Sequence, residues 1–360
     1  MFKQNKTIKL FAKAFLISIV ALLAAVGIGW LVVDNTIAPP EVPNIAVAIP
    51  LAPIETENEN SSSGQRSAGD AEDESSDHMP PPHLIMYEER RPYFFTFLIF
   101  GLTEGLHANT VMIAAYDAYS RQAYIISIPR DTEVDVQRTR RKIVNAYPTG
   151  FAGGRGHDGG VARMKYEVQT LIGFRPDFYI KVDYAAFTRM VDAVGGVEIY
   201  VPFHMRYDDP WQNLHINIPA GLQVLDGNNA LHFARYRMGN DRRMTISDYR
   251  RIEHQQQVLA AVAYELLHPA SLLRIPYFIG IFNDYVESDL AAGELLWLAN
   301  QGRLIGGLDA LDFYTLPTSG TSGAPYWYEL PDRNGILELV NRTVNPLMRD
   351  ITADDLRLAR

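Results

Sequence analysis

The most continuous apolar stretch lies near the N-terminus. Residues 14–33 contain no charged side chain. Their length matches the about 20 residues that a helix needs to cross the hydrocarbon core of a membrane. Residues 1–13 contain lysines but no acidic residue, which favours a cytoplasmic N-terminus with the rest of the chain outside. The alternative is a cleaved secretory signal, but the stretch is longer than a typical signal core and no clear A-x-A site ends it. We therefore predict one transmembrane helix at residues 14–33.

A polar stretch follows the apolar one. Residues 34–91 are rich in Pro, Ser, Asn, Glu and Asp and too poor in apolar residues to form a core. Most of the formal net charge of -9 comes from this stretch, so the remaining chain is only mildly acidic. We predict a disordered extracytoplasmic linker, which either lifts the rest of the chain from the bilayer or keeps it hydrated.

After residue 91 the pattern becomes one of short β-branched and aromatic runs that later alternate with helical periodicity. The strand-like runs are residues 93–102, 110–118, 123–128, 177–183 and 197–201. The helical segments are residues 161–172, 185–194, 246–267, 291–301 and 335–348. Polar residues 119–122 indicate a hairpin. This order predicts an α/β fold with a mixed central sheet covered by helices, formed by a domain at residues 92–268 and a C-terminal part, 269–360, packed on it.

The segment SIPRDT brings the first candidate chemistry. The apolar run 123–128 leads into Pro129, which lacks a backbone donor and therefore marks the end of a strand. Ligands in α/β proteins bind at strand ends, and the planar fork of Arg130 matches phosphate oxygens. Asp131 is a candidate for orienting the ligand, contacting a metal or acting as a general base. The alternative is a local ion pair between Arg130 and Asp131 that caps the strand.

An arginine-rich run lies about a hundred residues further along. Its arginines are Arg235, Arg237, Arg242, Arg243, Arg250 and Arg251. Only Asp241 and Asp248 oppose them within the run, so the arginines repel one another unless an anion lies among them. Arg235 and Arg237 alternate as in an extended segment and are expected to point to one side, whereas Arg251 and Gln255 share a helical face. The alternative is a solvated basic surface or a nucleic-acid patch.

Other side chains give weaker signals. The chain has no cysteine, which excludes a thiol nucleophile and a cysteine metal site. Its histidines lack metal-binding spacing and are assigned structural or surface roles. Asp241 and Asp248 are further candidates for a general base.

Taken together, these motifs resemble the LytR-CpsA-Psr family of bacterial cell-wall phosphotransferases, also described as cell envelope-related transcriptional attenuators. The resemblance runs from about residue 95 to 267 and includes LIFG, SIPRD, KIVNAY, LDGNNALHFARYR and DYRRIEHQQ. It implies a three-layer α/β/α domain with an apolar tunnel for the lipid. Apolar residues such as Phe187 and Met190 fit either an ordinary core or this tunnel, and the sequence alone does not separate the two. The resemblance also implies transfer of a glycopolymer 1-phosphate from a polyprenyl-pyrophosphate carrier to peptidoglycan at the cell membrane. The residues that match its pyrophosphate-binding and catalytic positions are Arg130, Arg235, Arg237, Arg251 and Gln255.

The sequence departs from this family where the resemblance implies a bound Mg²⁺ or Mn²⁺. Thr103 and Asn109 stand where acidic residues are expected, and Glu104 is a substitute after a shift of one residue. Because Mg²⁺ is generally held by carboxylates and substrate phosphates, we expect weakened metal binding. His254 replaces an arginine, which predicts an anion contact that changes near neutral pH.

Three functions follow from these observations. The first is a membrane-anchored glycopolymer phosphotransferase, and the second is a non-catalytic polyprenyl-pyrophosphate binder, suggested by Thr103 and Asn109. The third is a DNA-binding attenuator, suggested only by the arginine-rich run. The predicted topology places those arginines outside the cytoplasm and no DNA-binding helix pattern is present, so no nucleic-acid partner is expected.

Overall fold

The computed structural model describes residues 39–42, 89–103, 106–212, 214–240, 244–268, 271, 274–302, 305 and 308–359. The predicted membrane helix at 14–33 and most of the predicted linker lie outside these ranges. Within them, none of the helices combines the length and the apolar character that crossing a bilayer requires.

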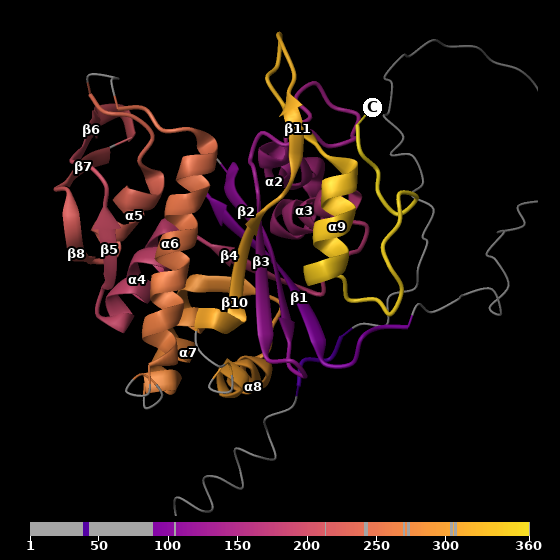
Figure 1. The fold of residues 1–360 in the computed structure, drawn as a ribbon, viewed down its shortest axis with the longest axis horizontal. Coiled ribbons are helices and arrows are strands. Elements are labelled where there is room, and N and C mark those ends of the chain that lie inside the picture. Colours follow the sequence, from indigo (N-terminus) through magenta and orange to yellow (C-terminus); the bar gives the residue numbers. More distant parts are fainter. Residues whose placement is uncertain are drawn as a thin grey trace, which may run out of the picture.

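A six-stranded mixed sheet forms the centre of the molecule, in the order β10-β3-β2-β1-β4-β9. Its strands are β1 (Phe94–Leu102), β2 (Ala108–Asp117), β3 (Gln122–Ile128), β4 (Phe178–Val182), β9 (Val286–Ser288) and β10 (Leu311–Thr315). β1 is antiparallel to β2 and parallel to β4, while β3 is antiparallel to β2 and parallel to β10. The strands β1, β3, β4 and β10 therefore run the same way, and their carboxyl ends meet at one edge of the sheet (Figure 1).

Both faces of this sheet are covered, because side chains along a strand point alternately to its two sides. Phe94, Leu98 and Phe100 of β1 belong to the core beneath α3 (Gly156–Ile172) and α9 (Arg333–Thr343). Phe95 and Phe97 point the other way and pack with residues of α8 (Ala292–Gly302). The predicted α/β fold with a mixed central sheet is confirmed.

A side lobe with its own core stands beside the sheet (Figure 1). It contains α4 (Tyr184–Val194), β5 (Val197–Val201), β6 (Met205–Asp209), β7 (Leu214–Ile218), β8 (Gly221–Leu225), α5 (Gly227–Arg235) and α6 (Asp248–Leu267). β5 pairs with β8 and β6 with β7, each antiparallel. Sequence analysis found only β5 among these strands; β6 and β7 carry more polar residues than β5 does.

The remaining elements are short or belong to the C-terminal part. They are η2 (Ile143–Asn145), α2 (Ala146–Gly150), η3 (Phe151–Arg155), η4 (Pro210–Gln212), α7 (Ile275–Tyr285), η6 (Leu308–Ala310), β11 (Thr318–Thr321) and β12 (Glu329–Pro331). The C-terminal part supplies β9 and β10 to the central sheet. It therefore completes the sheet rather than only covering it.

Local signals explain the helix boundaries that sequence analysis found. Gly173 and Gly195 end α3 and α4 in the left-handed conformation, with φ of 84° and 97°. Glycine reaches this region without steric cost, so it commonly ends helices. The side chain of Ser247 caps the other important boundary by accepting a hydrogen bond from the Arg250 N–H at the start of α6.

Two described pieces of the predicted linker contact the folded body. Arg90 forms a 2.8 Å ion pair with buried Asp177, and Arg91 forms a 2.7 Å ion pair with Asp117. Further towards the N-terminus, Pro40 is buried and Val42 packs beside α8. The prediction of a disordered linker at residues 34–91 therefore does not hold for residues 39–42 and 89–91.

Candidate anion-binding site and apolar cavity

The two arginine-bearing segments that sequence analysis singled out meet at the carboxyl edge of the sheet. Arg130 follows β3 directly after Pro129, and α6 begins nearby at Asp248. Arg130 Nε donates to Asp248 Oδ2 at 3.2 Å. Residues more than a hundred positions apart in the sequence thus form one site.

Asp248 is the centre of this site. Besides Arg130, its carboxylate contacts Arg237 Nη2 at 3.4 Å and Arg251 Nη1 at 3.4 Å. Asp131 lies 3.9 Å from Arg130 and also accepts from Lys142 Nζ at 3.0 Å. We call these residues, Arg130, Asp131, Lys142, Arg237, Asp248 and Arg251, the arginine cluster. Its four cations face two carboxylates, so it carries an excess of positive charge suited to a doubly charged anion.

Arg251 is the most buried arginine of the cluster, with 6% of its surface exposed. Burial lowers the pKa of its guanidinium to about 10, with Asp248 opposing the change and Arg130 and Arg237 adding to it. The side chain therefore remains charged at neutral pH. Among the described residues its Nε has no hydrogen-bond partner. A buried donor left unsatisfied is costly, so this N–H is suited to donating to a ligand oxygen.

The N-terminus of α6 adds to the same positive field. The cluster surrounds the first turn of α6, where backbone N–H groups and the helix dipole favour an anion. On the next turn, Gln255 is half-buried on the same helical face as Arg251. The neighbouring Gln256 donates to Ser127 Oγ at 3.1 Å and to the Tyr314 carbonyl at 2.9 Å. These two bonds fix α6 against β3 and β10.

Arg235 lies apart from the contacts that define the cluster. It is the last residue of α5, and its guanidinium lies 4.4 Å from the centre of the Tyr184 ring. The predicted extended alternation of Arg235 and Arg237 is wrong, because α5 continues through Arg235 and the chain becomes extended only at Tyr236. The assignment of Arg235 to pyrophosphate binding stays a prediction.

Of the residues proposed for the metal, Thr103 directly follows β1 and Asn109 is the second residue of β2. The backbone N–H groups of Thr103 and Asn109 both donate to the His107 carbonyl, at 3.1 and 3.0 Å. Glu104 lies outside the described residues. Within the described part of the chain, no group of three or more His, Cys, Asp or Glu side chains is arranged to hold a metal ion. Thr103 and Asn109 themselves offer no carboxylate to a Mg²⁺ ion, and the metal assignment stays a prediction.

His254 does not face the arginine cluster as the sequence suggested. Its ring is 2% exposed and stacks on Phe233 of α5, with ring centres 4.3 Å apart. Burial lowers the pKa of His254, so the ring is neutral at neutral pH. The predicted pH-sensitive anion contact is wrong, because α6 turns this position toward the core of the side lobe.

The C-terminal part closes one wall of the site. The Glu329 N–H donates to the Asp131 carbonyl at 3.0 Å, and the Glu133 N–H donates to the Glu329 carbonyl at 2.9 Å. The Glu329 carboxylate accepts a 3.2 Å hydrogen bond from the hydroxyl of Tyr249, the residue after Asp248. Glu329 thus joins the segment after β3 to the start of α6. Sequence analysis missed this role, since only the fold brings these three segments together.

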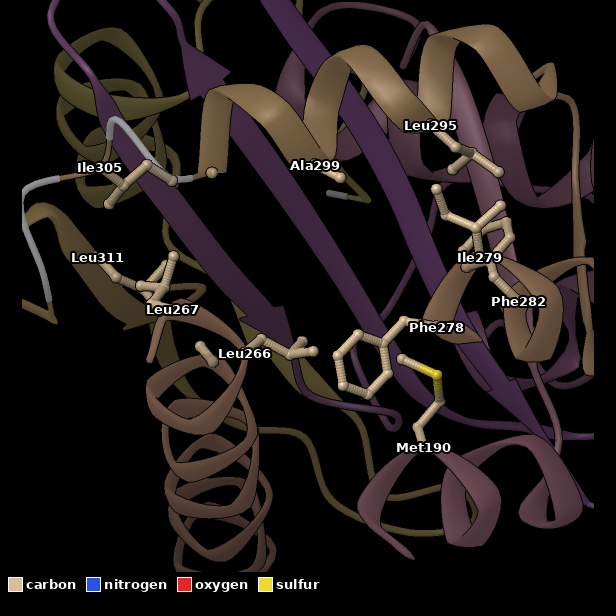
Figure 2. Close-up of a pocket in the computed structure, with 12 residues that line it drawn as sticks. Met190, Leu266, Leu267, Phe278, Ile279, Phe282, Leu295, Ala299, Ile305 and Leu311 are labelled. Carbon is tan, nitrogen blue, oxygen red and sulfur yellow. The ribbon is translucent and has the colours of Figure 1, made fainter. Parts of the chain in front are cut away.

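An apolar cavity of about 330 Å³ lies at the other end of α6. Figure 2 shows it between α8 on one side and α4, α6 and α7 on the other. Its lining side chains are all apolar and include Met190, Ala263, Leu266, Phe278, Phe282 and Leu295. Of the apolar residues that fitted either a core or a tunnel, Phe187 and Met190 both pack against the side-lobe core, and Met190 also lines this cavity.

The fold and the site define a class: an α/β protein with an arginine cluster at the carboxyl edge of its sheet and an apolar cavity at the other end of α6. The LytR_cpsA_psr family model matches residues 59–343, and the chain belongs to this family.

Its relatives carry more specific names. The regulatory protein MsrR of Staphylococcus aureus (strain COL) is 25% identical over 185 residues, which is 51% of each chain. The polyisoprenyl-teichoic acid–peptidoglycan teichoic acid transferase TagV of Bacillus subtilis (strain 168) is 26% identical over 276 residues, covering 72% of this chain and 66% of TagV. The chain thus spans about half the length of MsrR.

Solved structures share the fold. The crystal structure of Bacillus subtilis TagV has a TM-score of 0.56 at 22% identity, covering 75% of this chain and 100% of that one. TagT bound to LIIa-WTA has a TM-score of 0.55 at 19% identity, covering 71% of this chain and 91% of that one.

Proposed function

We propose that this protein is a membrane-anchored extracytoplasmic phosphotransferase, held in the bilayer by residues 14–33. It moves a glycopolymer 1-phosphate from a polyprenyl-pyrophosphate carrier to a peptidoglycan hydroxyl. One observation carries this proposal: Arg130, Arg237 and Arg251 converge at one end of α6, and the other end of the same helix lines an apolar cavity. The two ends suit the two halves of a lipid pyrophosphate.

The proposal is also supported by the name of TagV, a polyisoprenyl-teichoic acid–peptidoglycan transferase. Ala263 follows Arg251 by twelve residues on α6, a rise of about 18 Å at about 1.5 Å per residue. A diphosphate at the arginine cluster would therefore be separated from the cavity by about the length of several isoprene units. Nucleic acid is not among the proposed partners.

The reaction forms one bond and breaks one. The acceptor oxygen attacks the phosphorus that carries the glycopolymer, the bridging P–O bond of the diphosphate breaks, and polyprenyl phosphate leaves with the electron pair. Arg130, Arg237 and Arg251 neutralise the charge on the leaving phosphate, which is the main requirement of phosphoryl transfer. The hydroxyl proton passes to a base, for which Asp131 beside Lys142 remains our candidate.

Metal dependence remains a prediction, and no step above requires a metal. When bound, Mg²⁺ or Mn²⁺ supplies additional neutralisation of the phosphate oxygens. Because Thr103 and Asn109 replace carboxylates and the arginines already supply positive charge, we expect a weak requirement. Removal of divalent ions with EDTA should lower turnover by only about twofold, and substituting Mn²⁺ for Mg²⁺ should change it little. A complete loss of turnover in EDTA contradicts this expectation.

The replaced acids also favour a second candidate, a non-catalytic polyprenyl-pyrophosphate binder. The deciding experiment uses the full-length protein in detergent with a polyprenyl-diphosphate-linked glycopolymer and purified peptidoglycan. A transferase releases polyprenyl phosphate and makes the glycopolymer insoluble by attaching it to peptidoglycan. Saturable binding of the carrier without either product supports the binder, and absence of binding refutes both candidates.

A further inference from the structure

A short segment near the N-terminus is fastened to the folded body at α8. The N–H of Glu41 donates to Glu294 Oε1 at 3.2 Å, in the first turn of α8. The side chain of Pro40 is buried, and Val42 packs in the same cluster as Trp297 and Leu298 of α8. We call residues 39–42 the strap.

The strap limits how far α8 can lie from the membrane. The predicted membrane helix ends at Val33, six residues before Pro39. Six residues span at most about 22 Å when fully extended. With the helix embedded in the bilayer, the strap therefore lies within about 22 Å of the outer end of that helix. Because the strap is fixed to α8, one particular end of the molecule is held near the bilayer.

That end carries the side chains expected at a membrane surface. Figure 1 places α7, α8 and the C-terminal end of α6 together, with the β11–β12 connection at the opposite end. Tyr264 of α6 is 56% exposed, and Tyr277 of α7 is 55% exposed. The Arg274 guanidinium lies 5.8 Å from the centre of the Tyr277 ring. Tyrosines sit at the water–lipid boundary with the ring in an apolar layer, and arginine there contacts lipid phosphates.

The helix α7 has one apolar face turned inward. Phe278 and Phe282 line the cavity, whereas Tyr277 and Tyr285 are exposed to solvent. The exposed tyrosines of α7 are suited to contact a lipid surface, while its apolar face lines the cavity.

We infer that the end formed by α7, α8 and the C-terminal end of α6 rests on the lipid bilayer, so that the carrier lipid enters the cavity from the membrane. The arginine cluster, at the opposite end of α6, then faces away from the membrane, where the acceptor approaches. This inference rests on the proposed membrane anchoring and goes beyond it by fixing the orientation of the domain.

The absence of cysteine allows a direct test with single cysteines in the full-length protein. Tyr277→Cys and the matched control Trp327→Cys, at a 64% exposed site in the β11–β12 connection, are labelled with bimane and reconstituted in phosphatidylcholine–phosphatidylglycerol vesicles. Vesicles containing headgroup nitroxide lipid should quench the probe at position 277 at least twofold more than at position 327. Equal quenching, or stronger quenching at position 327, overturns the inference.

The strap is tested by cross-linking. Glu41→Cys with Glu294→Cys should be joined by a short bismaleimide in most molecules, whereas Glu41→Cys with Glu338→Cys on α9 should not. Equal cross-linking yields in the two pairs contradict the placement of the strap against α8.

Neither readout depends on turnover. If the protein is inactive but the probe at position 277 is quenched more than the probe at 327, the transferase proposal is refuted and the orientation stands. If the protein is active but both probes are quenched equally, the orientation is refuted and the transferase proposal stands. Failure of the protein to float with vesicles refutes the anchoring and the orientation together.

Discussion

The two ends of α6 contribute to two different kinds of candidate binding site. At its N-terminal end, Arg251 is held among charged groups from three segments, each placed by directional contacts. At its C-terminal end, Ala263, Leu266 and Leu267 line a cavity through nondirectional apolar contact. We call these the charged end and the apolar end. We therefore expect the loss of one side chain to impair binding strongly at the charged end. At the apolar end, the shape and volume of the cavity depend on many side chains.

The largest expected effect comes from removing the buried arginine at the charged end. Arg251→Ala should lower turnover of the lipid-linked glycopolymer by about 100-fold or more, the usual loss when one donor to a developing charge is removed. The matched control is Arg250→Ala, because Arg250 is adjacent on α6 but exposed and paired with Glu253 at 3.0 Å. Its turnover should stay within about twofold of the unmodified protein.

A loss of turnover caused by unfolding of the variant has to be distinguished from a loss of turnover in a folded protein. Thermal unfolding of both variants and of Arg251→Lys provides this, since lysine keeps the charge but not the forked geometry. A folded Arg251→Ala protein with nearly unchanged turnover removes Arg251 from the reaction. Recovery of full turnover by Arg251→Lys indicates that charge alone is required there.

At the apolar end a graded effect is expected. Ala299→Phe places a ring in the cavity and should raise KM for a long-chain carrier by about tenfold, since excluding two methylene groups costs about 1.6 kcal/mol. The control is Ala292→Phe, at an exposed position of the same helix α8. A carrier with a very short lipid should be insensitive to both changes. If Ala299→Phe leaves KM for the long-chain carrier unchanged, the lipid does not occupy this cavity.

A smaller effect should follow from removing the carboxylate that competes with the ligand. Asp248 contacts three arginines, so a bound diphosphate must share or displace it. Asp248→Asn removes one negative charge near the phosphates. The repulsion between two unit charges about 4 Å apart is about 1 kcal/mol or more. The affinity for inorganic pyrophosphate should therefore rise about fivefold in calorimetry. Glu253→Gln on the same helix serves as the control, and a weaker affinity in Asp248→Asn means that Asp248 instead organises the arginines.

The contrast between the ends of α6 also separates what the sequence predicts from what it does not. Arg130 and Arg251 were predicted correctly as neighbours across a long sequence separation, because few roles suit an arginine beside a core and the family motifs agree. The cavity was left undecided, since residues such as Met190 are equally suited to a core. The boundaries of helices that end at a glycine, such as α4, were predicted within a residue or two.

The errors arise where tertiary contacts decide. Arg235 was predicted to be extended, but α5 continues through Arg235, whose guanidinium lies over the Tyr184 ring. Glu329 was not recognised, because its contacts with Asp131 and Tyr249 depend on the C-terminal segment returning to the sheet edge. His254 was placed at the anion site by motif position, whereas the packing of α5 on α6 buries it.

The smallest expected effect concerns His254, which lies between the two ends of α6. Burial lowers the pKa of His254 in the folded state below its unfolded value of about 6.5. As the pH falls below about 6.5, the unfolded state takes up a proton that the folded state resists, so the free energy of unfolding decreases until the folded pKa is reached.

His254→Gln should therefore show a smaller fall in Tm between pH 7 and pH 5 than the unmodified protein. His204→Gln, at an exposed position, should keep the full pH dependence. Part of the fall should persist in His254→Gln, because burial and then Arg235 lower the pKa of His232 as well. Turnover at neutral pH should be the same in both variants, since the neutral His254 ring does not contribute to the charged end. A turnover that follows the titration of His254 contradicts its placement in the side-lobe core.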